Sequence, residues 1–139
     1  MDYIDFIIKN WYLFAALAII LAMLFGGTIM QVAHGVQGVN CSHAVQLMNH
    51  QDAIVVDVSE PNEFQIGHVP GAKNLPIGSL ENRLTDLEKY KAKPIIVSCR
   101  SGNRSKKGAL MLSKHGFKPV YEMSGGMVAW QRDNLPVEK

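Results

Sequence analysis

The residues of this sequence that are best suited to chemistry lie in one short loop that begins at Cys99. After the cysteine, the loop consists of Arg100, Ser101, Gly102, Asn103 and Arg104. Two arginines and the backbone amides at the start of a helix favour negative charge, so they stabilise the thiolate form of a cysteine. Because the thiolate is the nucleophilic form, we expect Cys99 to be catalytic and residues 100–104 to bind a small anionic substrate.

The alternative for Cys99 is a buried structural thiol, which is a common role for an isolated cysteine. A structural thiol has no need of Arg100 and Arg104 in the same tight turn. Like charges so close together repel one another unless they share an anion. The flanking arginines therefore favour a reactive thiol over a structural one.

Apolar runs on both sides of the loop predict the elements that position it. Residues 95–98 have the composition of a buried strand that leads directly into Cys99. The apolar positions of the segment behind the loop are Ala109, Leu110, Leu112 and Phe117. The loop is therefore expected between the end of a strand and the start of a helix, where unpaired amides converge.

Strands and helices alternate along the chain from residue 38 onward. Strands are predicted at 53–58, 95–98 and 119–121, and helices from an N-cap at Ser42, from Pro61, over 79–90, and over 127–132 with Trp130 directed inward. Residues 31–38 are interpreted as a short polar linker. This alternation indicates an α/β fold with a mostly parallel sheet covered by helices on both faces. Ligands bind at the carboxyl ends of the strands in such folds, which is where Cys99 is expected.

Several motifs, in matching order over about residues 37–135, resemble the signatures of the rhodanese, or sulfurtransferase, family. They are Val55–Val58, Glu63-Phe64, Gly67–Ala72, Asn74–Pro76, the loop Cys99–Ser105 and Gly125–Trp130. The resemblance implies a rhodanese-like domain with a five-stranded sheet and a sulfurtransferase that carries sulfur as a persulfide on Cys99. It also implies a supporting role for Asp57, which closes its strand and is placed to orient the arginine-rich loop.

The length of the loop separates this family from its closest relatives. Cysteine-based phosphatases and related arsenate reductases have a loop that is one residue longer, counted from the cysteine to the arginine, than the loop from Cys99 to Arg104. A tighter ring of amides suits a sulfane sulfur better than a tetrahedral phosphate. In addition, Ser98 precedes the cysteine where the phosphatase motif usually has histidine. Phosphatase or arsenate reductase activity is therefore less favoured than sulfur transfer.

The amino-terminal part of the chain is strongly apolar. The segment from Trp11 to Met30 has no charged residue, and as a helix it would be about 30 Å long, the thickness of a bilayer core. We therefore predict a tail at 1–10, a transmembrane helix at 11–33 and the rhodanese-like domain at 34–139. A cleaved signal peptide fits less well, because the apolar run is long and no Ala-x-Ala pattern follows it.

The charges near this helix say little about its orientation. Lys9 favours a cytoplasmic amino end, whereas a thiol that cycles through a persulfide needs a reducing compartment. We expect a single-pass protein of the cell membrane, the inner membrane where there are two, with its catalytic domain in the cytoplasm. The other side of the membrane is the alternative.

The remaining candidate residues are expected to be structural. His34, His43, His50, His68 and His115 lack the spacing of metal ligands, so neither a metal nor a cofactor is expected. Cys41 has no basic neighbours, and aromatic residues do not alternate with basic ones in the way that nucleic-acid binding requires.

The expected function is a membrane-anchored sulfurtransferase. It would move sulfane sulfur from a small anionic, thiosulfate-like donor to a thiol or a protein cysteine. Besides this donor and acceptor, the chain is expected to contact the lipid bilayer. The alternative is a non-enzymatic, membrane-tethered binding module that recruits a partner. Replacing Cys99 with serine separates the two, because only the enzyme would lose its cellular role.

Overall fold

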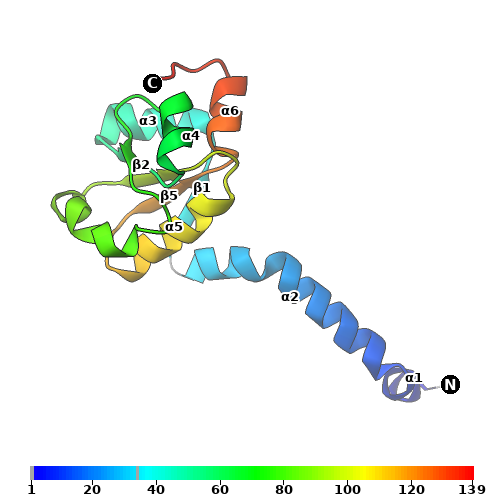
Figure 1. Cartoon of the computed structure of the whole chain (residues 1–139). Helices are drawn as coiled ribbons and strands as arrows, with labels where there is room; N and C mark the ends of the chain where they lie inside the picture. The colour runs from blue at the N-terminus through cyan, green and yellow to red at the C-terminus, as the bar shows by residue number, and fades with distance from the viewer. Residues whose placement is uncertain (1, 34) are drawn as a thin grey trace.

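The computed structural model describes residues 2–33 and 35–139, which form a helical arm and an α/β domain (Figure 1). The arm consists of α1 (Tyr3–Lys9) and α2 (Trp11–Ala33). The domain contains, in chain order, β1 (Val36–Val39), α3 (Cys41–Gln51), β2 (Ile54–Asp57), α4 (Pro61–Ile66), β3 (Lys73–Asn74), the 3-10 helix η1 (Glu81–Tyr90), β4 (Ile95–Ser98), α5 (Asn103–Lys114), β5 (Val120–Met123) and α6 (Gly126–Arg132).

The five strands form one parallel sheet in the order β1-β5-β4-β2-β3. All four residues of the central strand β4 are buried, which explains why its sequence is an unbroken run without charge. Asp57 at the end of β2 pairs in register with Ser98 at the end of β4. The expected α/β fold, with a five-stranded parallel sheet flanked by helices, is confirmed.

Two apolar clusters pack against the two faces of the sheet. The first lies under α5 and η1 and includes Val56, Leu87, Val97, Cys99 and Leu112. The second lies under α3 and α6 and includes Cys41, Leu47, Ile96, Met127 and Trp130. Successive side chains along a strand thus belong to alternate clusters, and Trp130 is directed inward as expected.

Several elements differ from the sequence-based expectation. Residues 36–39, within and next to the predicted linker, form the edge strand β1, in which only Val36 and Val39 are buried. Helix α3 is capped by Asn40 rather than Ser42, because the Asn40 side chain accepts a hydrogen bond of 2.8 Å from the backbone amide of His43. The helix predicted over 79–90 is the 3-10 helix η1, interrupted by non-helical backbone at Arg83.

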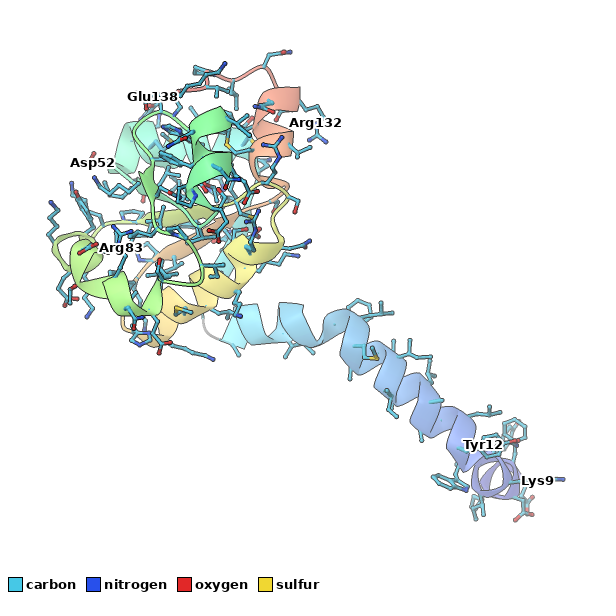
Figure 2. All side chains as sticks on the ribbon, viewed as in Figure 1. Lys9, Tyr12, Asp52, Arg83, Arg132 and Glu138 are labelled. Carbon is cyan, nitrogen blue, oxygen red and sulfur yellow. The ribbon has the colours of Figure 1, made fainter. Side chains whose placement is uncertain are left out.

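The arm is bent where α1 meets α2, and residues 3–9 of the predicted tail are helical. The large apolar side chains of both helices are exposed, for example Met23 at 81%, and they project on several sides (Figure 2). Within the described residues, no single helix satisfies both the length and the composition of a membrane span. Helix α1 and residues 11–27 satisfy them only as a pair, bent by 72°.

Candidate active site

The predicted nucleophile, Cys99, lies directly after β4 at the carboxyl edge of the sheet. Its Sγ atom accepts a hydrogen bond of 3.0 Å from the backbone amide of Gly102, and its side chain is completely buried. An amide that points at sulfur favours negative charge on it. The structure therefore provides the sulfur with one of the amide contacts that the loop sequence predicts.

The loop backbone is held from behind by the start of α6. The amide of Met127 donates to the carbonyl of Cys99 at 2.8 Å, and the amide of Val128 donates to the carbonyl of Arg100 at 3.0 Å. Gly126 lies so close to these carbonyls that a Cβ atom there would overlap the carbonyl oxygen of Cys99. These two hydrogen bonds fix the carbonyls of Cys99 and Arg100 on the side of α6, and the Gly102 amide points at the sulfur.

Gly102 is the N-cap residue of α5. Its backbone has φ +101°, a left-handed conformation that strongly favours glycine. Asn103 and Arg104 follow in the first turn of the helix. A side chain at Gly102 would therefore strain the peptide whose amide contacts Cys99.

Arg104, predicted to bind substrate, is held by a residue that the sequence does not place beside it. Its guanidinium donates two hydrogen bonds to the carboxylate of Glu63 in α4, at 2.6 and 2.8 Å. The hydrogen bond with Arg104 lowers the pKa of Glu63 to about 2. Glu63 in turn raises the pKa of Arg104, with smaller contributions from negative charge on Cys99 and Asp57.

The other loop residues lie near the surface. Arg100, Ser101 and Asn103 are exposed, whereas Gly102 is buried. The charge of Arg100 adds to the lowering of the pKa of Glu63, so both loop arginines act on one region. The loop thus combines a fixed guanidinium at Arg104 with an exposed one at Arg100.

Asp57 supports the neighbouring loop rather than the arginines directly. Its Oδ1 atom accepts hydrogen bonds from the amide of Ser59, at 2.9 Å, and from the Ser59 hydroxyl. The side chain of Asn74 donates to the carbonyls of Asp57 and Ser59 at 3.1 and 2.8 Å. The Oδ2 atom of Asp57 is buried without a hydrogen-bond partner in the described part of the chain.

Comparison with known proteins agrees with this geometry. The model of the rhodanese-like domain matches residues 41–133, which include the Cys99 loop with strand β4 before it and helix α5 after it. The chain belongs to the rhodanese-like domain family. The uncharacterized protein YibN of Escherichia coli is 35% identical over 124 residues, which cover 88% of this rhodanese chain and 86% of YibN.

Two further similarities concern the rhodanese domain alone. The thiosulfate sulfurtransferase GlpE of Ectopseudomonas mendocina is 38% identical over 95 residues, covering 67% of this chain and 83% of that protein. The crystal structure of a rhodanese-related protein from Thermoplasma volcanium superimposes with a TM-score of 0.67 at 28% identity, covering 73% of this chain and 97% of that one.

Two residues that were expected to be structural are buried in the rhodanese domain. The ring of His68 stacks on Phe64 at 3.6 Å between centroids, and its Nδ1 atom lies 2.8 Å from the Phe64 carbonyl oxygen. Cys41 belongs to the cluster on the opposite face of the sheet from that of Cys99, and burial raises the pKa of its thiol.

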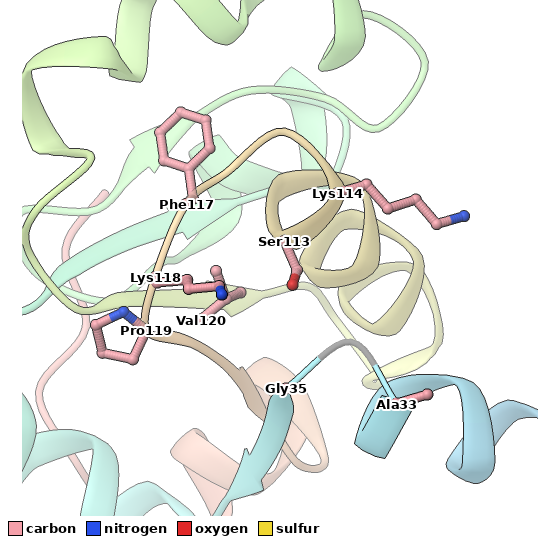
Figure 3. Close-up of a pocket in the computed structure, with 8 residues that line it drawn as sticks. All are labelled: Ala33, Gly35, Ser113, Lys114, Phe117, Lys118, Pro119 and Val120. Carbon is pink, nitrogen blue, oxygen red and sulfur yellow. The ribbon is translucent and has the colours of Figure 1, made fainter.

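A separate hollow of about 700 Å³ lies at the base of the arm (Figure 3). It is lined by Ala33, Gly35, Ser113, Lys114, Phe117, Lys118, Pro119 and Val120. Val120 begins β5, so this hollow is at the amino edge of the rhodanese sheet, opposite the edge that carries Cys99.

Proposed function

We propose that this chain is a sulfurtransferase that moves sulfane sulfur from a thiosulfate-like donor to a thiol through a persulfide on Cys99. The observation that carries the proposal is the Gly102 amide, 3.0 Å from Sγ, in a loop whose carbonyls are held by α6. Such a cradle stabilises negative charge both on the thiolate and on a persulfide. The GlpE proteins, named as thiosulfate sulfurtransferases, support the same reaction class.

In the first step, the thiolate of Cys99 attacks the outer sulfur of the donor. A new sulfur–sulfur bond forms while the sulfur–sulfur bond of thiosulfate breaks, and sulfite leaves with the electron pair. Arg100 is exposed, so its positive charge attracts an anionic donor. Because the thiol is fully buried, entry of the donor requires a local opening of the structure around Cys99.

In the second step, an acceptor thiolate attacks the outer sulfur of the persulfide. The bond between the two sulfurs on Cys99 breaks, and the Cys99 thiolate is restored with the electron pair. The amides of residues 100–104 offset the negative charge in both states of the cysteine. The expected acceptor is a small thiol or a protein cysteine.

We also propose that the arm anchors the domain in the cell membrane, with the domain on the cytoplasmic side. Its exposed apolar side chains would otherwise contact water, whereas a bilayer would bury them. The similarity to YibN extends into the arm, because its 124 residues exceed the 105 residues of 35–139. Lys114 and Lys118, beside the hollow at the base of the arm, would then lie near anionic headgroups.

The experiment for the reaction is mass measurement of the full chain in detergent after incubation with thiosulfate. We expect one added sulfur, about 32 Da, which disappears when an acceptor thiol is added. The C99S variant should show no addition, and the matched C41S variant should react like the native protein. An unchanged mass of the folded native chain with thiosulfate and other sulfane donors would contradict the proposal and favour a binding module. Release of phosphate from a phosphorylated substrate would indicate a phosphatase instead.

A further inference from the structure

A buried carboxylate lies beneath the Cys99 loop and has no part in the reaction described so far. Glu122 in β5 is only 3% exposed. Its Oε1 atom is 3.1 Å from the hydroxyl oxygen of Ser105 in α5. The same oxygen would lie 3.5 Å from a Cβ atom at Gly102, so the carboxylate is next to the peptide that contacts the sulfur.

Ser105 connects this carboxylate to the loop backbone. Its Oγ atom is 2.9 Å from the carbonyl oxygen of Gly102 and 3.1 Å from Glu122. A hydroxyl group has one hydrogen and can donate it to only one of these two acceptors. If Ser105 donates to the Gly102 carbonyl, the hydrogen bond with Glu122 requires a proton on the carboxyl group.

The surroundings of Glu122 favour that proton. Burial raises the pKa of Glu122, and this effect exceeds the opposing effects of the hydrogen bond with Ser105 and of the charge of Lys106 in α5. The strand residues in register with Glu122 are Gly38 in β1 and Val97 in β4, neither of which is titratable. On the loop side, the charged side chains are Arg100 and Arg104, and the ionisable Cys99 is linked to Glu122 through Gly102 and Ser105.

We propose that Glu122 is a positioning residue that holds a proton and, through Ser105, fixes the backbone of Gly102, whose amide is directed at Cys99. Its catalytic consequence rests on the proposed sulfur transfer. When Glu122 ionises, it competes for the hydrogen of Ser105, the Gly102 carbonyl loses the hydrogen bond from Ser105, and a negative charge appears beneath the loop. Both effects disfavour the thiolate and the anionic donor.

The first test measures how two rates depend on pH in the full chain in detergent. The rates are persulfide formation from thiosulfate and alkylation of Cys99 by iodoacetamide, assigned by peptide mass. The native protein should show a second transition besides that of the thiol, with persulfide formation declining at alkaline pH. E122Q should lack this transition, because the amide can donate to Ser105 at any pH. E88Q, which changes an exposed glutamate in η1, should retain it.

The second test observes the proton itself. Infrared difference spectra between the native protein and E122Q should contain the carbonyl stretch of a protonated carboxyl group at pH values where exposed glutamates, with pKa about 4.3, are ionised. In an S105A background, E122Q should change the pH profile less than it does in the native chain, since the connection to Gly102 through Ser105 is already removed and only the charge of Glu122 remains.

The proposal is overturned if the protonated carboxyl stretch is missing or if E122Q keeps the second transition. The alkylation rate requires no sulfur donor, so it separates the two hypotheses. If Cys99 accepts no sulfur from any donor but its alkylation shows the transition that E122Q removes, the proposed function fails and the role of Glu122 stands.

Discussion

The ion pair between Arg104 and Glu63 joins two segments that are 41 residues apart in the sequence. A bidentate pair fixes the plane of the guanidinium as well as its position. Arg104 is therefore held beside Cys99, and it contributes positive charge without rotating freely. Glu63 thus acts on the loop through Arg104 and is a positioning residue.

The lowered pKa of Glu63 predicts a specific dependence of stability on pH. Its pKa falls from 4.5 to about 2 in the folded chain, so the ionised group stabilises the fold above about pH 4.5 and loses this effect as the pH falls toward 2. We expect E63Q to lower the free energy of unfolding by about 0.5–1 kcal/mol at neutral pH, since the pair is partly exposed. Denaturant unfolding at several pH values measures this.

The difference between E63Q and the native chain should shrink between pH 4.5 and pH 2. E88Q serves as a control, because Glu88 forms an exposed pair with Lys91 and should change stability by much less. If the difference in the free energy of unfolding stays constant over this range, the pair of Glu63 and Arg104 does not cause the loss of stability at acidic pH.

At the residue scale, the sequence identified the loop but not its partners. Cys99 and residues 100–104 could be chosen because they are contiguous and of unusual composition. Glu63 and Glu122 could not, because they meet the loop only after α4 and β5 have packed around it. Asp57 was predicted to orient the arginine-rich loop; its side chain binds Ser59, and Glu63 forms the hydrogen bonds with Arg104.

At the scale of elements, the loop depends on the close approach of α6. Gly125 just before α6 and Gly126 at its first position both have positive φ, and Gly126 lies against the carbonyls of Cys99 and Arg100. The helix can therefore donate its first amides to the loop only if residue 126 has no side chain. This explains the glycine pair that the sequence carries ahead of Trp130.

We predict that G126A displaces the loop and slows persulfide formation at least about tenfold, which corresponds to about 1.4 kcal/mol of lost stabilisation. The expected cause is steric, because the added Cβ atom overlaps backbone rather than a flexible side chain. Single-turnover mass measurements with thiosulfate give the rate. G78A is the matched control, since a Cβ atom at Gly78 meets nothing within 4 Å. Equal rates in G126A and G78A would contradict this account of the turn.

Elements with strong local signals were predicted well, and those defined by tertiary contacts were not. The buried strands β2 and β4 and the amphipathic helix α5 were recognisable from apolar runs. Strand β1 has only two buried positions and gains its structure from pairing with β5. The choice of Asn40 over Ser42 as the cap depends on where the helix begins, which the composition leaves open because both residues can cap.

At the scale of the whole molecule, the proposed role of the arm as a membrane anchor can be tested by a single substitution. We predict that L21D releases the chain from membranes, because aspartate near the centre of a spanning segment costs about 2.5–3.5 kcal/mol. Leu21 lies in α2 with its side chain half exposed. The measurement is the membrane-bound fraction of the expressed chain after an alkaline carbonate wash. L21A should remain bound, and complete removal of the native chain by the wash would contradict membrane insertion.

The parallel order of the strands has a consequence for the acceptor. The arm enters at the amino end of β1, so the starts of all five strands face it and their ends face away. The four residues of β4 alone separate the sulfur from that edge by roughly 13 Å. In an anchored chain, the reactive group would thus open toward the aqueous phase. Water-soluble acceptors, including folded proteins that carry a cysteine, could reach it, whereas lipid-dissolved compounds could not.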